Sequence, residues 1–424
     1  MRLCVIRKYN VNFALMKKYT IKHSLKTPAP ALMKISKYLS LALFIALFTA
    51  CITPFSPEGL QTQGGTLVIE GDIILNGATK VYLSESRALY SSEPFRYLTN
   101  AQVFVLSEHG ETYLSTVIFE PNAPPCYLID TKGLPFNCAY YVSIFLADGT
   151  QFISDPIIPM AAPQIDSIEF VVQDAQTAVD FFVTTYADRN SSPFYRWSYT
   201  EDWEYHSLYD PELYYNQATG EVLRYGPGEK PEVYYCWNQS ISEDILIAKT
   251  DHLDNNTVYR QPLHTIDRHS DKISYLYSLE LQQMSISEEA YIYWVNMRKN
   301  NQEIGGIFSP QPSEVFGNIY MVRVDGKPDR KVLGYISAGM VATKRIFVTE
   351  KELGIYQPTI NCPEMSLFEP EPADRFNFYQ MGLRPYKGGY DGGEEIWVSR
   401  DCIDCRRQGG GNKNKPPFWP NDHQ

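Results

Sequence analysis

Acidic residues are absent from the first 50 positions of this chain, which contain nine lysines and arginines. A basic stretch followed by an apolar run, here Tyr38 to Ala50, is typical of a targeting segment and lies outside the fold. The run is too short to span a bilayer comfortably, which favours a cleaved signal peptide over a transmembrane anchor. Reading from Met33 gives the most regular signal, so we interpret residues 1–50 as a signal segment that truly starts at Met33.

Basic residues are scarce in the rest of the chain. Without residues 1–50, 29 Lys and Arg face 49 Asp and Glu, a formal charge of −20. This balance excludes a nucleic-acid binder and a protein held on anionic lipids by charge. The 374 residues that remain are enough for two domains, each with its own core.

Cys51 follows Thr49 and Ala50 directly after the apolar run. This placement resembles a bacterial lipobox, although Phe48 stands where leucine is usual. The alternative is an ordinary signal peptide with a chance cysteine. We predict that Cys51 is lipidated and anchors the protein, because each buried methylene of an acyl chain adds about 0.8 kcal/mol.

An even number of cysteines remains after Cys51, and an exported chain meets an oxidising environment. We therefore expect disulfides among them. The short separation of Cys126 and Cys138 makes them a plausible local pair, while the other pairings stay open. The disulfide candidates are Cys126, Cys138, Cys236, Cys362, Cys402 and Cys405.

Composition and turn signals divide the mature chain. Residues 51–65 are rich in Pro, Gln and Gly, as in a lipidated tether. Short strand patterns separated by Asn-Gly and Asp-Gly turns predict an N-terminal β-sandwich over residues 66–160. Three prolines within 155–163 mark a boundary. A second β-rich domain is expected over 161–406, and residues 407–424 form a Gly/Pro-rich tail.

The second domain shows two different periodicities. Tyr195, Trp197 and Tyr199 alternate with polar residues, which predicts a strand with one aromatic face. Residues 285–288 have the form of a capping box, and apolar residues then recur at helical spacing, which predicts one helix over 287–300. The fold class is therefore mainly β: two β-sandwich-like domains, the second of immunoglobulin or fibronectin type with one inserted helix.

Two segments carry a family resemblance: SEEAYIYWVNMRKNNQEIGGIFSPQPSEVFGNIY at 287–320 and VLGYISAGMVATKRIFV at 332–348. They resemble a family of Bacteroidota outer-membrane lipoproteins catalogued as domain of unknown function 4249. The resemblance implies a first domain similar to transthyretin-like or carboxypeptidase-regulatory sandwiches. It also implies a TonB-dependent outer-membrane transporter as partner, because such proteins often accompany these transporters.

Residues suited to catalysis or metal binding are few. His264 and His269 lie near Asp267 but lack the spacing and central Glu of the helical zinc motif, so we interpret them as exposed loop residues. Ser337 does not have the glycine spacing of a nucleophile elbow. Cys402 and Cys405 lack a redox or second-pair context. We expect no enzyme activity, no metal and no cofactor.

Aromatic residues are abundant between positions 194 and 237 and are interleaved with polar residues. Tyrosine suits binding surfaces because it joins an apolar ring to a polar tip. The alternative is that many of these rings belong to the core. Tyr214 and Tyr215 cannot both face the core of one strand. The candidate binding aromatics are Tyr205, Tyr209, Tyr214, Tyr215 and Tyr225.

These observations favour a non-catalytic lipoprotein of the outer membrane that binds and assists a TonB-dependent transporter in nutrient uptake. The rival hypothesis is a structural or adhesive cell-surface protein that uses its sandwiches as spacers. Genes adjacent to a transporter gene would favour the first hypothesis. The ligand and the membrane face do not follow from the sequence.

Overall fold

The computed structural model describes residues 65–87, 94–120, 123–173, 177–188, 191–253, 256–302, 315–323, 330–354, 362–388, 393–407 and 414–421. Strands dominate this part of the chain, which confirms the mainly β fold class. The signal segment and the Cys51 lipidation site lie outside the described residues. Within them, no helix combines the length and the apolar character needed to cross a bilayer.

The first sheet has ten strands: β1 (Leu67–Gly71), β3 (Ala78–Glu85), β4 (Arg96–Tyr97), β5 (Gln102–Ser107), β6 (Thr112–Ile118), β7 (Cys126–Asp130), β8 (Tyr140–Phe145), β9 (Gln151–Ser154), β20 (Ile319–Met321) and β21 (Val332–Leu333). Their order is β20-β9-β8-β5-β6-β7-β3-β1-β21, and β4 pairs with β3. Buried and partly exposed residues alternate along β3 and β5, because successive side chains point to opposite faces. Ile69, Val105 and Ile144 from different strands meet in one core.

β20, β21 and residues 338–340 return to this first domain, although the sequence indicated that they belong to a second domain over 161–406. β20 pairs with β9, and β21 runs parallel to β1. A small parallel sheet joins β2 (Ile73–Ile74), β22 (Ala338–Met340) and β10 (Met160–Ala161). Parallel neighbours need long connections, so the local sequence pattern does not reveal them.

Glycines allow this returning segment to pass close to the first sheet. Gly334 has φ of 137°, and a Cβ there would lie 2.1 Å from the carbonyl oxygen of Ile69. A Cβ on Gly317 would lie 1.6 Å from the carbonyl oxygen of Gly334. A Cβ on Gly339 would lie 2.2 Å from the carbonyl oxygen of Met160. Only glycine fits these positions, so the glycines on either side of Ser337, Gly334 and Gly339, have a structural role.

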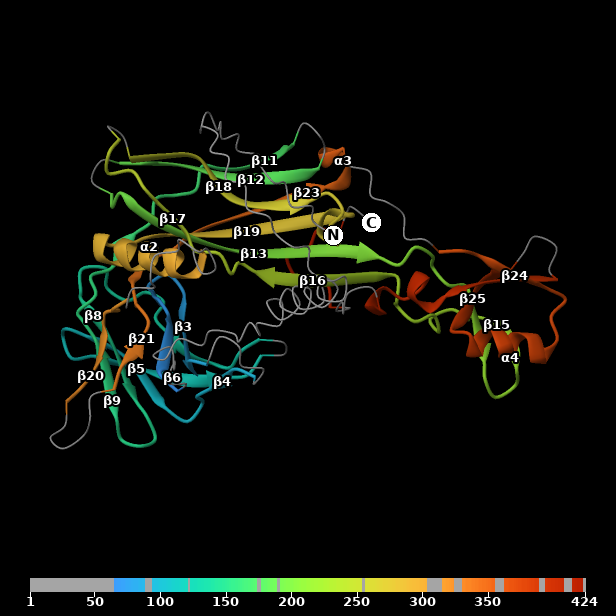
Figure 1. Ribbon diagram of the computed structural model, residues 1–424, viewed down its shortest axis with the longest axis horizontal. Helices are drawn as coiled ribbons and strands as arrows, with labels where there is room; N and C mark the ends of the chain where they lie inside the picture. The colour runs from blue at the N-terminus through green and yellow to red at the C-terminus, as the bar shows by residue number, and fades with distance from the viewer. Residues whose placement is uncertain are drawn as a thin grey trace, which may run out of the picture. The chain divides into compact units, whose positions relative to one another are not determined.

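The second domain is a sandwich of two antiparallel sheets. One sheet contains β11 (Ser167–Val172), β12 (Ala178–Ala187) and β18 (Asn256–Asp267). The other contains β16 (Tyr235–Ile241), β13 (Phe194–His206), β19 (Leu276–Ser285) and β23 (Ala342–Thr349), with β17 (Leu246–Lys249) beside β13. Figure 1 shows the two sheets as stacked layers. Tyr195, Trp197 and Tyr199 lie in the core between them, as their alternation predicts.

The predicted helix is present as α2 (Glu288–Gln302). Its N-cap is Ser287, whose hydroxyl accepts the Ala290 N–H at 3.2 Å. The expected capping box began at Ser285, so the observed cap lies two residues later. Two shorter helices were not expected: α3 (Glu350–Leu353) and α4 (Pro372–Gln380).

Segments far apart in the chain build a third unit, which we call the lobe (residues 207–233, 362–388 and 393–407). It contains the hairpin β14 (Leu213–Asn216) and β15 (Glu221–Arg224), the sheet β24 (Met365–Phe368), β26 (Glu394–Ser399) and β25 (Leu383–Gly388), and α4. The short 3₁₀ turns η2 (Arg400–Cys402) and η3 (Cys405–Arg407) follow, and η1 (Asp271–Ile273) lies in the second sandwich. Figure 1 shows β15, β24, β25 and α4 together.

The cysteine prediction needs a correction. Disulfides join Cys236 to Cys405 and Cys362 to Cys402, while Cys126 and Cys138 are free and buried. Cys126 opens β7 opposite Ile118, and β7 then carries the chain away from it. Cys138 lies in the following loop, where its thiol donates to the Ala139 carbonyl at 3.4 Å. Short sequence separation therefore did not mean proximity of the thiols.

Candidate ligand-binding cavity

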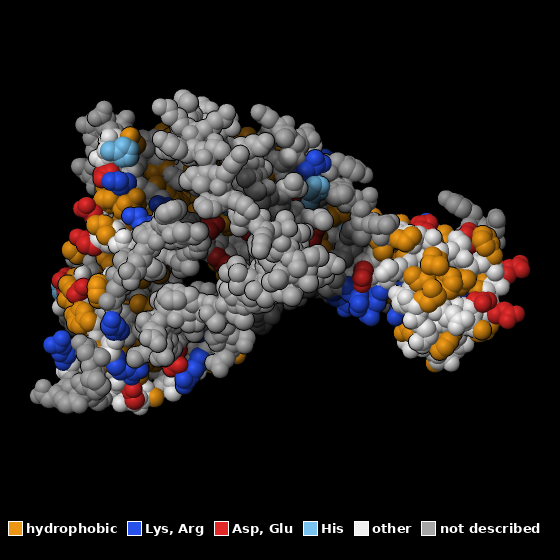
Figure 2. Space-filling view, in the orientation of Figure 1, with side chains coloured by type: hydrophobic (Ala, Val, Ile, Leu, Met, Phe, Trp, Pro, Cys, Tyr) orange, Lys and Arg blue, Asp and Glu red, His pale blue; other side chains and the backbone are white. Residues whose placement is uncertain are grey.

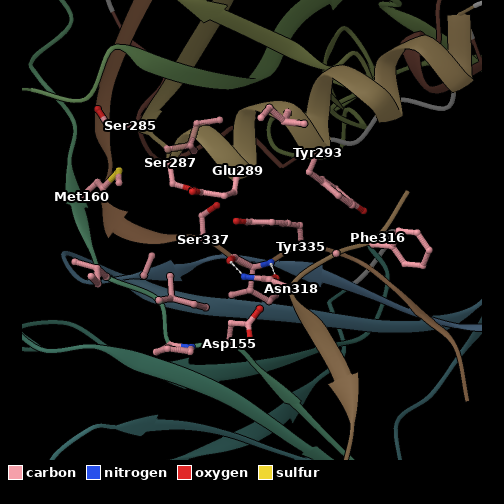
Figure 3. A pocket seen from close by; sticks show the side chains of 18 of the residues that line it. Asp155, Met160, Ser285, Ser287, Glu289, Tyr293, Phe316, Asn318, Tyr335 and Ser337 are labelled. Carbon is pink, nitrogen blue, oxygen red and sulfur yellow. Dashed lines mark hydrogen bonds between the residues drawn. The ribbon is translucent and has the colours of Figure 1, made fainter. Parts of the chain in front are cut away.

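A cavity of about 740 Å³ lies where α2 faces the segment before β22. This volume falls in the range of about 300–1,000 Å³ that is common for small-molecule sites. Figure 3 shows Ser287, Glu289 and Tyr293 on the helix side, with Tyr335, Ser337 and Asn318 opposite. Four segments form the walls: 155–160, 285–296, 315–318 and 335–338. The cavity therefore combines segments that are far apart in sequence.

One face of α2 forms the upper wall. Glu289, Ile292, Tyr293 and Asn296 line the cavity, at offsets of three, four and seven residues. These offsets place side chains on a single helical face. The helix itself was predicted, but no local pattern indicates that this face borders an open space.

Two buried hydroxyls on the cavity wall have no hydrogen-bond partner among the described residues: Ser285 Oγ and Ser337 Oγ. Ser285 is fully buried and Ser337 is 6% exposed. A buried polar atom without a partner typically costs about 1–3 kcal/mol. Such atoms therefore mark a place where a bound molecule can complete the hydrogen bonding.

The backbone around Ser337 is held firmly. The Ser337 N–H donates to Asp72 Oδ1 at 3.0 Å, and its carbonyl accepts the Ile73 N–H at 2.9 Å. Asn318 bridges the neighbouring residue: its side chain donates to the Ile336 carbonyl at 2.8 Å and accepts the Ile336 N–H at 2.9 Å. Figure 3 shows these two hydrogen bonds. Hydrogen bonds therefore hold the backbone that carries the Ser337 hydroxyl.

Asp72 links the two sandwiches beside the cavity. Its second carboxylate oxygen pairs with the guanidinium of Arg196 on β13. Arg196 in turn lies over the ring of Trp294, with its Cζ 4.8 Å from the ring centroid. Because Asp72 also accepts the Ser337 N–H, the same carboxylate fixes the domain contact and the cavity wall.

The electrostatics of the cavity favour a ligand that donates hydrogen bonds. Asp155 and Glu289 line it, and its described lining contains no Lys, Arg or His. Burial raises the pKa of the Tyr335 phenol, a hydrogen bond from Ser287 opposes this, and the carboxylates of Glu289 and Asp155 raise the pKa further. Burial, with a smaller contribution from Glu70, raises the pKa of Tyr293 to about 12. Both phenols stay protonated at neutral pH.

The rim of the cavity is apolar and exposed. Ile158, Ile292 and Phe316 are 72%, 52% and 77% exposed. All three belong to the lining. Exposed apolar side chains around a cavity with few polar groups are typical of binding sites.

The described lining of the cavity does not form a serine-nucleophile site. A serine nucleophile needs an adjacent base, and the described lining offers Ser337 no His or Lys. No helix follows Ser337 directly, since β22 begins at Ala338. The arrangement therefore differs from a nucleophile elbow.

The five candidate aromatics do not form one exposed platform. Tyr205 lies in the core of the second sandwich at 5% exposure, which corrects its assignment as a binding residue. Tyr205 shares the inward face of β13 with Trp203, while Asp202 and Glu204 point to the other face. The other four tyrosines are half-buried in the lobe.

The tyrosines of the lobe pack in pairs. Tyr209 stacks on Tyr386 with centroids 4.5 Å apart, and Tyr214 stacks on Tyr225 at 4.8 Å. Tyr215 contacts other rings instead, and both Tyr214 and Tyr215 are half-buried on β14. Tyr214, Tyr215 and Tyr225 line a second cavity, within the lobe.

His264 also differs from its prediction. It lies on β18 with a side chain only 9% exposed, instead of in an exposed loop. Its ring stacks between Phe181 and Tyr199, and its Nε2 is 3.1 Å from Glu201 Oε1. The Tyr277 hydroxyl donates to the same oxygen at 2.9 Å. His264 therefore belongs to a buried polar cluster that joins the two sheets.

One group of potential metal ligands occurs among the described residues. The ligand atoms of Glu108, His109 and Cys138 lie within 4.8 Å of one another. Glu108 and His109 are exposed, and Glu108 already accepts the Ala139 N–H at 3.1 Å. The group thus lacks the enclosed, supported geometry of a structural metal site.

Sequence reasoning missed the cavity itself. It considered Ser337 only as a nucleophile and did not consider Ser285. No local signal identifies either hydroxyl, because the absence of a partner depends on how distant segments meet. The glycines around Ser337 were the one available sign of a close approach.

A family model described as domain of unknown function (DUF4249) matches residues 52–345. The matched stretch contains all residues that line the cavity and ends before Cys362. The C-terminal half of the lobe therefore lies beyond it. No curated protein matches the chain.

Proposed function

We infer, from the premise that the chain belongs to the family of domain of unknown function 4249, that it is a non-catalytic binding lipoprotein of the outer membrane. It assists a TonB-dependent transporter in nutrient uptake and holds a ligand, or a segment of that partner, in the cavity at Ser285 and Ser337. A lipid on Cys51 anchors it.

One observation supports binding above all: two residues that line the cavity, Ser285 and Ser337, carry buried hydroxyls without partners among the described residues. Native proteins satisfy almost all buried polar groups, so two exceptions in the lining of one cavity support the binding of a ligand there. The nearby carboxylates of Asp155 and Glu289 add acceptors. The bound group should therefore carry N–H or O–H donors, or a positive charge.

The exposed rim supports the partner contact. Ile292 and Phe316 come from different segments and border the same opening. Apolar anchors at the centre of a contact supply most of its binding energy, and a hot spot costs about 2 kcal/mol or more when it is removed. A charge placed at both positions should abolish docking.

The test is affinity purification of the lipidated protein from envelope membranes, followed by mass spectrometry. Three chains are compared: the wild type, the rim variant Ile292→Glu with Phe316→Glu, and the control Phe368→Glu. Phe368 is 74% exposed on β24 and lies outside the cavity, so it tests the effect of an added carboxylate at an equally exposed position elsewhere. We expect the wild type and the control to retain the transporter and the rim variant to lose it.

Two results would contradict the proposal. Equal retention by the rim variant would show that the cavity does not mediate the contact. Recovery of the wild type without any transporter would reject the accessory role and favour the structural or adhesive alternative. Melting temperatures of the three proteins exclude unfolding as the cause.

A further inference from the structure

The lobe contains a second cavity whose walls are fixed by disulfides. The Cys362–Cys402 bridge closes the C-terminal part of the lobe, and Cys236–Cys405 ties it to β16. Tyr209, Tyr386 and Val398 pack around the first bridge. Cross-links of this kind restrict the unfolded chain and hold the walls in place. A preorganised cavity loses little entropy when it binds a ligand.

Tyrosine rings and an amide form one side of this cavity of about 340 Å³. Tyr214 and Tyr225 stack on each other, and Tyr215 lies 5.0 Å from Tyr379 between ring centroids. The Gln217 side chain donates to the Tyr379 hydroxyl at 2.5 Å. The wall thus joins flat apolar faces to several hydroxyl and amide groups, which suits a ring-shaped ligand with its own hydroxyls.

Arginine side chains also line this cavity. Arg384 donates to the carbonyl oxygens of Leu383 at 2.6 Å and Tyr379 at 3.2 Å, and its Cζ lies 3.8 Å from the centroid of the Tyr379 ring. It makes no ion pair with a carboxylate of the described residues. Burial lowers the pKa of the Arg384 guanidinium, and repulsion from Arg400 and Arg407 adds to this.

The neighbouring cations are only partly neutralised. Arg406 makes two hydrogen bonds of 2.7 Å to Asp404, and Arg400 lies 3.9 Å from the same carboxylate. Three arginines and one aspartate therefore line the cavity. Figure 2 shows Lys and Arg side chains gathered at this part of the surface, on a chain that is acidic as a whole. Local positive charge attracts anions.

We propose that the lobe cavity binds an acidic saccharide, with the guanidinium of Arg384 holding its carboxylate or sulfate and the tyrosines contacting the face of its ring. A guanidinium matches the geometry of an oxyanion with two parallel hydrogen bonds. The cavity volume is near the lower end of the usual range for ligand sites, which suits one or two sugar rings. This site is separate from the cavity at Ser285 and Ser337 and does not depend on the function proposed above.

The test is isothermal titration of the full mature chain with a disaccharide of galacturonic acid, with the neutral disaccharide of galactose, and with an acidic peptide. We expect the acidic disaccharide to bind and the neutral disaccharide to bind at least tenfold more weakly. Arg384→Gln should weaken binding of the acidic disaccharide at least tenfold. The matched control is Arg224→Gln, because Arg224 is an exposed lobe arginine that pairs with Glu212 outside the cavity lining.

Arg384 also bonds to backbone carbonyls, so melting temperatures accompany the titrations. Arg384→Lys keeps the charge and should retain part of the affinity even if Arg384→Gln loosens the lobe. Equal binding of the neutral disaccharide, binding of the peptide in place of the saccharide, or unchanged affinity of Arg384→Gln would each overturn the proposal. Absence of any binding by the wild type would do so as well.

Discussion

Trp419 donates its indole N–H to a carboxylate oxygen of Glu204 at 2.6 Å, across 215 residues of chain. Glu204 is fully buried on β13, and its other oxygen lies 2.6 Å from His206 Nε2. Trp419 also packs with Trp237 and Leu276. The segment expected to be a simple Gly/Pro-rich tail therefore contains a residue that covers the outer face of the second sandwich.

Replacing Trp419 by Phe keeps most of the apolar contact but removes this hydrogen bond. A hydrogen bond to a charged group contributes about 1.5–3 kcal/mol, so we expect the free energy of unfolding to fall by about 2 kcal/mol. Urea unfolding measures it. The control is Trp294→Phe, because the Trp294 indole N–H has no partner among the described residues. Equal losses in the two variants would contradict the role of the Glu204 contact.

Stability should depend on pH through Glu201. Burial raises the pKa of this carboxyl, but hydrogen bonds from His264 and Lys272 outweigh it, so the pKa lies below its usual value of 4.5. A carboxyl with a lowered pKa in the folded state stabilises the protein above pH about 4.5, and this stabilisation is lost as the pH falls through the folded-state pKa.

Glu201→Gln should therefore reduce the free energy of unfolding by about 3 kcal/mol at pH 7, because it breaks a buried charge pair. At pH 3 the difference from the wild type should shrink. Urea unfolding at both values tests this, and Glu212→Gln is the exposed control with little effect expected. A constant difference at both pH values would show that Glu201 does not titrate as described.

The cysteines should divide into two classes in peptide mapping without reductant. We expect linked peptides for Cys236 with Cys405 and for Cys362 with Cys402, and free thiols at Cys126 and Cys138. Burial raises the pKa of the Cys126 thiol, which leaves little reactive thiolate at pH 8. Alkylation of Cys126 should therefore be slow until urea is added. A Cys126–Cys138 bridge in the map would contradict the structure.

Local periodicity predicted which faces are buried, but not which segments become neighbours. The alternation of Tyr195, Trp197 and Tyr199 identified a core face, and Ser287 was placed correctly at the start of the helix. The same kind of pattern could not show that Tyr205 is also buried, because acidic residues lie beside it on the strand. Their hydrogen-bond partners are far away in the sequence. Buried polar contacts of this kind depend on the complete fold.

The candidate sites were harder to predict for the same reason. The lobe joins Tyr214 to Arg384, and the larger cavity joins Ser285 to Ser337. Each pair comes from segments that only tertiary structure brings together. Sequence reasoning found the tyrosines because aromatic residues are conspicuous among polar ones. It could not find a serine whose only distinction is the lack of a partner.

Lipidation should depend on Cys51. We expect Cys51→Ser to release the protein into the soluble fraction of the envelope, because the sequence offers no other apolar anchor after the signal. Fractionation and an immunoblot measure this, and Cys138→Ser is the control that should remain in the membrane. Membrane retention of the Cys51→Ser protein would reject the lipoprotein interpretation.

Ser285 and Ser337 give the sharpest test of the larger cavity. Removing a buried hydroxyl that lacks a partner also removes its desolvation penalty, which is about 1–3 kcal/mol. We therefore expect Ser285→Ala and Ser337→Ala to leave the free energy of unfolding unchanged or to raise it by about 1 kcal/mol, while retention of the ligand or transporter falls. Stability and binding should move in opposite directions, which loss of fold cannot produce.

Ser278 is the matched control for these variants. It lies on the same strand as Ser285, is equally buried, and accepts a hydrogen bond from Arg345 at 2.8 Å. Ser278→Ala removes this hydrogen bond while Arg345 still donates to Asp202, so it should lower the free energy of unfolding by about 1 kcal/mol without affecting retention. Urea unfolding and affinity purification are measured on the same three variants. If Ser285→Ala and Ser337→Ala destabilise the protein as much as Ser278→Ala does, their hydroxyls are satisfied within the fold and do not await a ligand.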